Sequence, residues 1–535
     1  MARRKPTRAI SAAQPAAVVP VGAPSSRGRS VLVTVGTVVA TGAIAWFLST
    51  ALIGRAVGGR LPAVTNLAAD PRLVADAIAT ADAAARRWPT AATVGELAMT
   101  YHASLRPVEA IQTYALAATL DPSNWRWPYY RGLLLEERGD QVGAHEALTA
   151  VARLTPQHGL TRFHLAEIAF KAGRREEART EYLAAQTAGV TGAPAQVNDL
   201  PARRGIPLTA YASLGLARLQ LEAGNRQAGR EQLTAIIRAN PDFGSAYALL
   251  SRRTDDESAA AADGGRAYVP PADPWLDAVV ARSWHPDLLL KHAAIAGRTG
   301  EFAWRQWLVQ RALTANPNGL DVLLEAAATA RAANRPADAL AYLRQAEAVA
   351  PDDHHTLVEQ GRTLSDMGRL AEAEAVLRRA IHVRDATAEY NLANVLDQQD
   401  RWDEAREHYE RALTINPFHA RAMNNLGIGY SRRGQPEKAV PLYRHAIEAA
   451  PDLVDSYLNL SAALGVLGQF REALAATDQA IELNPSVANA HNNRGIALAK
   501  LGRRDEARAA FEAALRLEPG HTDARRNLAL VARPY

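Results

Sequence analysis

The chain has 535 residues and no cysteine. Disulfide bonds, thiolate metal sites, covalently attached c-type haem and cysteine catalysis are therefore excluded together. The redox compartment stays open, because a cysteine-free chain tolerates either environment. Hydrophobic residues make up 48% of the chain and charged residues 22%, which is the composition of a folded protein.

Acidic residues are absent from residues 1–60, which hold eight arginines or lysines. The rest of the chain has 53 basic and 56 acidic residues, so its net charge is −3. The overall charge of +5 thus comes from the N-terminal tail, and a basic groove for nucleic acid is not expected. Arginine outnumbers lysine by 56 to five, a bias typical of GC-rich bacterial genomes.

Charge is also missing from residues 31–53, VLVTVGTVVATGAIAWFLSTALI. At about 1.5 Å per residue, a helix of this length crosses a hydrocarbon core of about 30 Å. We predict a transmembrane helix over residues 31–54 rather than a signal peptide, whose apolar core is usually about 7–15 residues. Basic residues are more numerous before it than after it. The positive-inside rule therefore predicts a single-pass inner (plasma) membrane protein with a cytoplasmic N-terminus and a periplasmic or other extracytoplasmic remainder.

Motifs of catalysis are missing as well. The sequence has no glycine-rich phosphate loop, no nucleophile elbow and no helix-borne zinc-binding histidine pair. Its 14 histidines are scattered, and the adjacent pair His354–His355 opens a helix where the two rings cannot easily face one metal ion. We therefore expect no enzymatic activity, no metal and no other cofactor.

What the chain does have is a repeat. Pro417, Pro451, Pro485 and Pro519 are spaced 34 residues apart, and a period of this length indicates one supersecondary unit copied many times. Within one copy, small and large apolar residues mark two helices on either side of a turn at Gly434. These residues are Leu426, Gly427 and Tyr430 on the first helix and Ala439, Tyr443 and Ala446 on the second. The pattern resembles the tetratricopeptide repeat.

The resemblance implies an all-α solenoid of about 11 helix-turn-helix repeats, each burying its apolar faces by stacking on its neighbours. Ala439 and Ala446 would let paired helices approach closely, and Asp452 and Ser486 suit the N-caps of the following helices. Glycine, proline and aspartate clusters indicate two interruptions, at 189–207 and 254–275. Trp275 and Trp284 indicate that part of the second interruption packs against the protein.

From the repeat and its breaks we predict seven regions. They are a basic flexible tail (1–30), the transmembrane helix (31–54), a capping helix or linker (62–90), an N-terminal array of four repeats with a loop insertion at 189–207 (91–243), a partial helix and interrupting segment (244–285), a C-terminal array of seven repeats (286–521) and a capping helix (522–535). The repeat at 354–385 is two residues short.

Asparagine recurs with the same period, at Asn391, Asn425, Asn459, Asn493 and Asn527. In tetratricopeptide repeats this helix face lines the concave groove, and a similar ladder lines the repeats of O-GlcNAc transferases. The resemblance therefore implies a peptide-binding groove. The catalytic domain of those transferases is not expected in this chain. A carboxamide has both donors and an acceptor for the backbone of an extended peptide, but it can equally bridge adjacent helices. With their neighbours, the predicted groove residues are Asn391, Asn394, Asn424, Asn425, Asn459, Asn492, Asn493 and Asn527.

The N-terminal array has aromatic residues on the corresponding face, namely Tyr129, Tyr130, Phe163 and His164. They could form a second groove that anchors a ligand, or they could pack between repeats.

Two functional hypotheses follow. The first is a non-enzymatic, membrane-anchored scaffold or assembly protein that binds extended segments of partner proteins or peptides in its groove. The second is a targeting or regulatory subunit of a separately encoded envelope enzyme complex, such as a glycosyltransferase or a polymer synthase.

Overall fold

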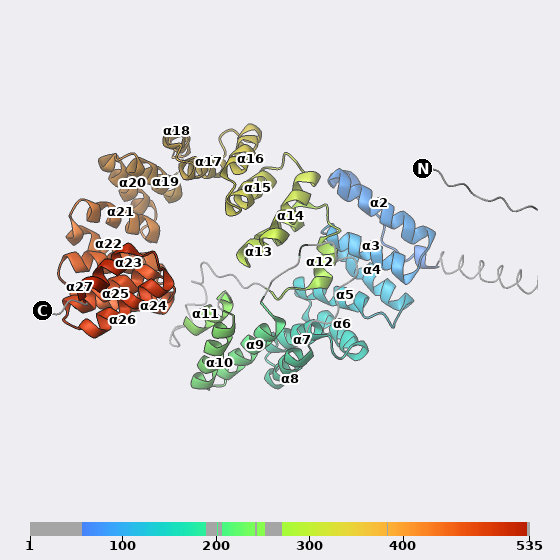
Figure 1. Ribbon diagram of the computed structural model, residues 1–535. Coiled ribbons are helices and arrows are strands. Elements are labelled where there is room, and N and C mark those ends of the chain that lie inside the picture. Colours follow the sequence, from blue (N-terminus) through green and yellow to red (C-terminus); the bar gives the residue numbers. More distant parts are fainter. Residues whose placement is uncertain are drawn as a thin grey trace, which may run out of the picture. The chain divides into compact units, whose positions relative to one another are not determined.

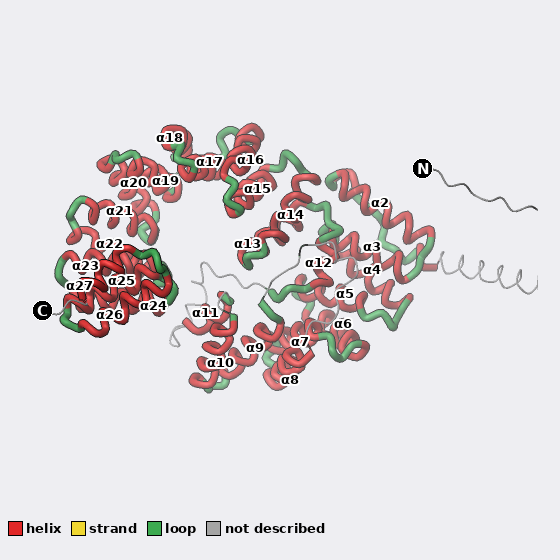
Figure 2. The backbone as a smooth tube through the Cα atoms, viewed as in Figure 1, coloured by secondary structure: helices red, strands yellow, loops and turns green. Residues whose placement is uncertain are grey.

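The computed structural model describes residues 56–188, 201, 206–240, 243–251, 270–381 and 384–531. Within these residues the chain is all-α, and they contain no strand (Figure 2). No helix in the described ranges combines the length and the hydrophobicity needed to cross a membrane. The predicted tail (1–30) and transmembrane helix (31–54) lie outside these ranges.

The described helices follow one another in pairs (Figure 1). After a 3₁₀ turn (Leu67–Ala69) and α2 (Arg72–Arg87), the first four pairs are α3 (Ala91–Ala103) with α4 (Pro107–Leu120), α5 (Arg126–Glu137) with α6 (Gln141–Leu154), α7 (Gly159–Lys171) with α8 (Arg175–Ala188), and α9 (Leu208–Glu222) with α10 (Arg226–Ala239). Two shorter helices follow, α11 (Gly244–Ser251) and α12 (Pro274–Val280).

Seven further pairs complete the described chain. They are α13 (Pro286–Arg298) with α14 (Phe302–Ala315), α15 (Leu320–Ala332) with α16 (Pro336–Val349), α17 (His354–Asp366) with α18 (Leu370–Ala380), α19 (Ala386–Gln398) with α20 (Trp402–Ile415), α21 (Ala420–Arg432) with α22 (Pro436–Ala449), α23 (Val454–Val466) with α24 (Phe470–Leu483), and α25 (Ala488–Lys500) with α26 (Arg504–Leu517), followed by α27 (Thr522–Val531).

The first helices of these seven pairs begin 34 residues apart, with one exception. The step from α17 to α19 is 32 residues, in agreement with the short repeat at 354–385. The missing length is taken from α18, which has 11 residues where the other second helices have 14. The 34-residue spacing of the prolines is therefore the spacing of the helix pairs.

The turn within each pair has one residue with positive φ. Gly434 has a φ of 70°, and the same place is taken by Asn334 at 55° and Asp400 at 60°. Left-handed backbone favours glycine because it has no Cβ, and asparagine and aspartate tolerate this backbone better than most other residues. The turn is thus specified locally, before any packing.

Small residues hold the two helices of a pair close together. Ala439 and Ala446 are fully buried, and a Cβ added at Gly427 would lie 2.7 Å from Cε1 of Tyr443. Larger side chains at these places would therefore force the helices apart. The expectation from the sequence that small residues permit close approach is confirmed.

The core runs from pair to pair. Leu364 on α17, Leu377 on α18, Leu392 on α19, Tyr409 on α20 and Leu426 on α21 belong to one buried cluster. Each pair therefore completes its hydrophobic core only with the next pair, as expected of a solenoid. The described residues form two compact units, one of residues 56–67, 75–102 and 106–156 and one of residues 68–74, 103–105 and the described chain from 157 onward.

The predicted N-caps at Asp452 and Ser486 are wrong. The N-cap positions of α23 and α25 are Leu453 and Val487, and neither side chain caps its helix. The helix begins three residues after the proline of the turn, so the residue that follows the proline falls one place too early to reach the free N–H groups.

Part of the interrupting segment is packed, as its tryptophans indicate. The Asp273 side chain caps α12 by accepting hydrogen bonds from the backbone N–H groups of Trp275 and Leu276, and Trp275 is buried. The guanidinium of Arg311 lies 3.7 Å from the ring centre of Trp284, which is a cation–π contact.

Candidate functional site

A hollow of about 490 Å³ lies against the first helices of three consecutive pairs, α17, α19 and α21. Its volume falls within the range of about 300–1,000 Å³ that is common for ligand pockets. Three of the predicted groove residues, Asn391, Asn394 and Asn425, line it. Asn459, Asn492, Asn493 and Asn527 lie on α23, α25 and α27, outside this hollow.

Asn394 and Asn425 are bonded to each other in the wall of the hollow. Asn425 Nδ2 donates to Asn394 Oδ1 at 2.8 Å and to the Tyr390 hydroxyl at 3.2 Å. The Tyr409 hydroxyl also donates to Asn394 Oδ1, at 2.7 Å. Burial raises the pKa of Tyr409, so this hydroxyl keeps its proton and remains a donor.

The same bridge recurs further along the array. Asn459 Nδ2 donates to Asn424 Oδ1 at 3.0 Å, and Asn527 Nδ2 donates to Asn492 Oδ1 at 3.1 Å. The acceptors Asn424 and Asn492 are buried. These asparagines connect the first helix of one pair to the first helix of the next, which is the bridging alternative considered from the sequence.

Two asparagines at the same repeat position make no such bridge. The side chains of Asn391 and Asn493 form no hydrogen bond with any other described residue, and both are only partly buried. In each bridge to the preceding pair, the residue 35 positions earlier is an acceptor, either Tyr390, Asn424 or Asn492.

For Asn493 that residue is Leu458, which has no polar side-chain atom. For Asn391, across the short repeat, the equivalent residue is Val358, 33 positions earlier. An asparagine at this position is therefore bridged when the preceding helix has an acceptor there, and otherwise it keeps its carboxamide for another partner. Sequence reasoning missed this rule, although the residues at that spacing give the signal.

Charged side chains surround Asn391 in the hollow. Arg421 is exposed and forms no ion pair with a described residue. The other lining charges are mostly paired: Arg432 lies 3.2 Å from Asp397, and Arg362 lies 3.7 Å from Glu359. Arg421 is thus the cation in this hollow that is most available to a ligand.

A second hollow of about 620 Å³ lies beside the first, against α15, α16 and α17. The two share Glu359, Arg362 and Asp366 as lining residues. Arg331 pairs with Glu359 at 2.6 Å and with Asp366 at 3.3 Å. The groove surface therefore continues over four consecutive first helices.

His419 stands where α21 begins and lines the first hollow. Its Nδ1 accepts a hydrogen bond from the backbone N–H of Ala422 at 3.1 Å, so the ring caps the helix in its neutral form. Burial lowers the pKa of His419, and the positive charge of Arg421 lowers it further. The Asp385 carboxylate acts in the opposite direction.

The aromatic residues of the possible second groove are mostly inside the protein. Tyr129, Tyr130 and Phe163 are buried, whereas His164 is partly exposed. The rings of Tyr129 and Tyr130 lie 6.1 Å apart, and those of Phe163 and Tyr211 are also 6.1 Å apart, edge to face. Packing is therefore the role the structure gives to the three buried rings. A ligand would find little of their surface exposed.

Within the described residues, no group of three or more His, Asp or Glu side chains is arranged to hold a metal ion.

Three family models described as tetratricopeptide repeat match the chain. They cover residues 129–193, 354–379, 384–452, 458–521 and 495–533. The matched segments fall on the helix pairs from α5 to α8 and from α17 to α26, and the last of them extends over α27. The matched segments are tetratricopeptide repeats.

Solved structures with similar repeats differ widely in length. YrrB, described as a tetratricopeptide protein with an unusual peptide-binding site, is 24% identical, with 34% of this chain and 96% of that chain covered and a TM-score of 0.31. The Cut9–Hcn1 hetero-tetramer of APC/C is 13% identical, with 82% and 96% covered and a TM-score of 0.41.

A tetratricopeptide repeat protein from Parabacteroides merdae is 16% identical, with 46% and 99% covered and a TM-score of 0.36. No curated protein matches the present chain significantly.

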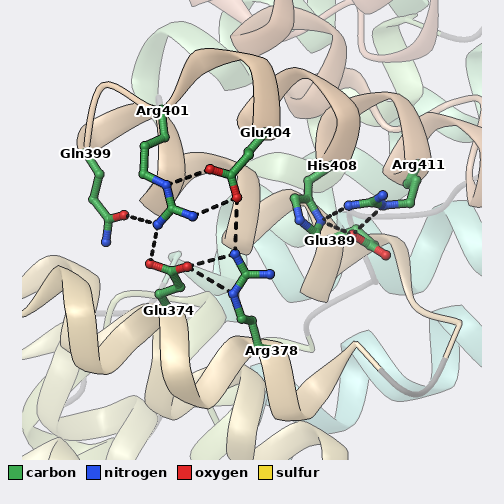
Figure 3. Close-up of polar contacts among 8 residues, drawn as sticks. All are labelled: Glu374, Arg378, Glu389, Gln399, Arg401, Glu404, His408 and Arg411. Carbon is green, nitrogen blue, oxygen red and sulfur yellow. Dashed lines mark hydrogen bonds and ion pairs between the residues drawn. The ribbon is translucent and has the colours of Figure 1, made fainter.

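Outside the hollow, two polar clusters lie on α18–α20, one between neighbouring helix pairs and one within the pair α19–α20 (Figure 3). In the first, Arg401 pairs with Glu404 at 2.6 Å and with Glu374 at 2.7 Å, and Arg378 contacts both carboxylates. In this tetratricopeptide array the cluster ties the shortened α18 to α20, the second helix of the next pair. None of these residues lines either hollow.

The second cluster is buried. His408 Nδ1 lies 2.5 Å from Glu389 Oε2, and both residues are buried, with exposed fractions of 5% and 7%. Burial lowers the pKa of His408. Because the pair faces neither hollow, we assign it to packing between α19 and α20 and not to ligand binding.

Proposed function

We propose that the chain is a non-enzymatic scaffold that binds extended segments of partner proteins along α17, α19 and α21, the first helices of three consecutive pairs. The observation that carries this proposal is the carboxamide of Asn391, which has no hydrogen bond to the described protein and lines a 490 Å³ hollow together with the ion-pair-free Arg421. A surface that presents a free donor, a free acceptor and an available cation is suited to a polypeptide ligand.

The proposed binding mode follows from the chemistry of these side chains. Asn391 can donate to a carbonyl and accept from an N–H of the same extended strand, while Arg421 can pair with a carboxylate of the partner. Ile428, partly buried in the same hollow, adds apolar contact. Each neutral hydrogen bond contributes only about 1 kcal/mol, so micromolar binding needs contacts over several repeats.

We further propose that residues 31–54 anchor this scaffold in the inner membrane, with the N-terminus cytoplasmic and the repeats extracytoplasmic. The support is the uncharged run of residues 31–53 and the excess of basic residues before it. A reporter fused after Tyr535, active on one side of the membrane only, tests this orientation. Activity in the cytoplasm would contradict it.

The binding proposal can be tested with a photo-crosslinking amino acid placed at Ile428, inside the hollow, in the full chain in its membrane. The matched control carries the same group at Phe418, which is 78% exposed in the preceding turn and does not line the hollow. We expect position 428 to capture defined segments of partner proteins, and capture to fall sharply in the Asn391→Ala/Arg421→Ala double variant.

Equal capture at both positions, or capture unaffected by the double variant, would contradict groove binding. A single enzyme captured in stoichiometric amount would favour the alternative of a subunit in an envelope enzyme complex, whereas a range of clients would favour the scaffold.

A further inference from the structure

Arg86, near the end of α2, holds the chain segment that follows the predicted membrane helix. Its guanidinium donates to the Gly58 carbonyl at 3.2 Å and to the Pro62 carbonyl at 2.9 Å, and it pairs with Asp82 at 2.7 Å. Val57 and Leu61 are buried beside these contacts. The last turn of α2 is therefore fixed against residues 57–62.

Three residues of the two segments that Arg86 joins are exposed, and we call them the basic–aromatic patch: Arg60, Arg87 and Trp88. Trp88 is 54% exposed, unusually so for a large aromatic ring. Neither Arg60 nor Arg87 forms an ion pair with a described residue. Two available cations beside an exposed tryptophan are the combination found at membrane–water interfaces.

The position of the patch along the chain agrees with this chemistry. Residues 56–58 are helical, and Gly58 is four residues beyond the end of the predicted membrane helix at residue 54. A membrane helix that continued from residue 54 at about 1.5 Å per residue would bring Gly58 about 6 Å beyond the hydrocarbon boundary. The headgroup layer on each side of a bilayer is about 5–8 Å thick. Arg86 therefore holds the end of α2 at headgroup depth.

We propose that the basic–aromatic patch contacts anionic lipid headgroups and so orients the first compact unit, which carries the patch, on the membrane surface. Arg60 and Arg87 pair with lipid phosphates, and Trp88 lies in the interfacial layer. This inference rests on the membrane anchor proposed above. The patch adds a second point of contact to the membrane helix, and this second contact fixes the orientation of the first compact unit on the membrane.

The absence of cysteine makes a clean test possible, because a single introduced thiol is the only labelling site. We suggest Ala84→Cys, exposed on α2 next to the patch, and Val466→Cys, 77% exposed on α23, as the matched control. Each full-length variant is labelled with a polarity-sensitive fluorophore. It is then reconstituted in phosphatidylcholine vesicles with and without phosphatidylglycerol.

We expect the label at position 84, but not that at 466, to be protected from a water-soluble quencher when phosphatidylglycerol is present. Arg60→Gln/Arg87→Gln should shift the equilibrium from protected to exposed by up to about 30-fold, because each arginine near an anionic surface contributes about fivefold.

Flotation of the vesicles separates failure of the anchor from failure of the patch. A chain that does not float with the vesicles would refute the anchor. A chain that floats while positions 84 and 466 are quenched equally would leave the anchor standing and overturn the patch. Equal protection at position 84 without phosphatidylglycerol would overturn its assignment to anionic lipid.

Discussion

Asn459 and Asn493 stand at the same place in neighbouring repeats, 34 residues apart, yet they differ in what they contact. Asn459 donates to the buried Asn424 on the preceding first helix. Asn493 has Leu458 at the corresponding position 35 residues earlier, and its side chain makes no hydrogen bond with a described residue. The repeat position supplies the same side chain in both pairs. The neighbour across the interface decides whether that side chain holds the solenoid together or is available to a ligand.

The difference divides the asparagine ladder into two groups. Asn425, Asn459 and Asn527 form structural bridges, and Asn391 and Asn493 do not. A variant that removes a bridging asparagine therefore changes the interface between repeats, and its effect on binding is indirect. The predictions that follow test this division.

The largest effect is expected from Asn424→Leu. This substitution replaces the acceptor between α21 and α23 by an apolar side chain, like that of Leu458 at the next junction. Asn459 and Ser456 both donate to Asn424 Oδ1, and loss of the acceptor leaves two donors unpaired. We expect local opening of α21 and α23 to become easier by about 2–3 kcal/mol. Hydrogen exchange of peptides from these helices measures it, and unchanged protection would show that the bridge is not stabilising.

Lowering the pH should weaken the helix that carries Asn424 and Asn425 without titrating the carboxamides. His419 caps α21 as a neutral ring, and its folded pKa lies below its ordinary value. Above about pH 6.5 the ring is neutral in both states and the cap is intact. As the pH falls below that value the unfolded chain binds the proton first, so stability declines by up to about 1.4 kcal/mol per pH unit.

Hydrogen exchange of α21 between pH 7 and 5, corrected for intrinsic rates, reports this loss. The matched control is His419→Asn, because asparagine caps helices but does not titrate. If the control shows the same loss, His419 is not its source. His158, which caps α7 in the same way and whose pKa burial lowers to about 4, should behave alike.

Single removal of a bridge should have a smaller effect than removal of its acceptor. Asn459→Ala deletes one hydrogen bond and should cost about 1 kcal/mol, whereas Asn493→Ala should change stability by less than about 0.5 kcal/mol. The two variants delete the same atoms at the same repeat position. Equal destabilisation in hydrogen exchange would contradict the division of the ladder.

The smallest effect is expected from building a bridge. Leu458→Asn places an acceptor where Asn493 can reach it, and it should protect α25 by about 0.5 kcal/mol if the new bond outweighs the lost apolar contact. Increased exchange in α25 relative to the wild-type chain would show that the spacing rule does not transfer to this junction.

Much of the fold could be predicted because its signals are local. Gly434 at positive φ, buried Ala439 and the prolines spaced by 34 residues each act within one repeat. The short repeat could also be predicted from the sequence, because its two missing residues shift the start of α19. The N-cap residues could not be predicted, because the number of residues between Pro451 and the start of the next helix depends on how the turn packs.

The candidate site was predicted in part. Asn391, Asn394 and Asn425 do line one hollow. Arg421 lies on the same helix face as Asn425, but it was not among the predicted site residues. For Tyr129, Tyr130 and Phe163 the sequence left a second groove and packing between repeats open, and all three side chains are buried.

The sequence by itself determined the helix pairs, their 34-residue period and the position of each turn, because these depend on backbone preferences and on side chains within about one repeat. Only the tertiary structure decided which asparagines are bonded and which are available. That outcome depends on the register between first helices of adjacent pairs, where a donor meets either an acceptor or an apolar side chain 35 residues earlier.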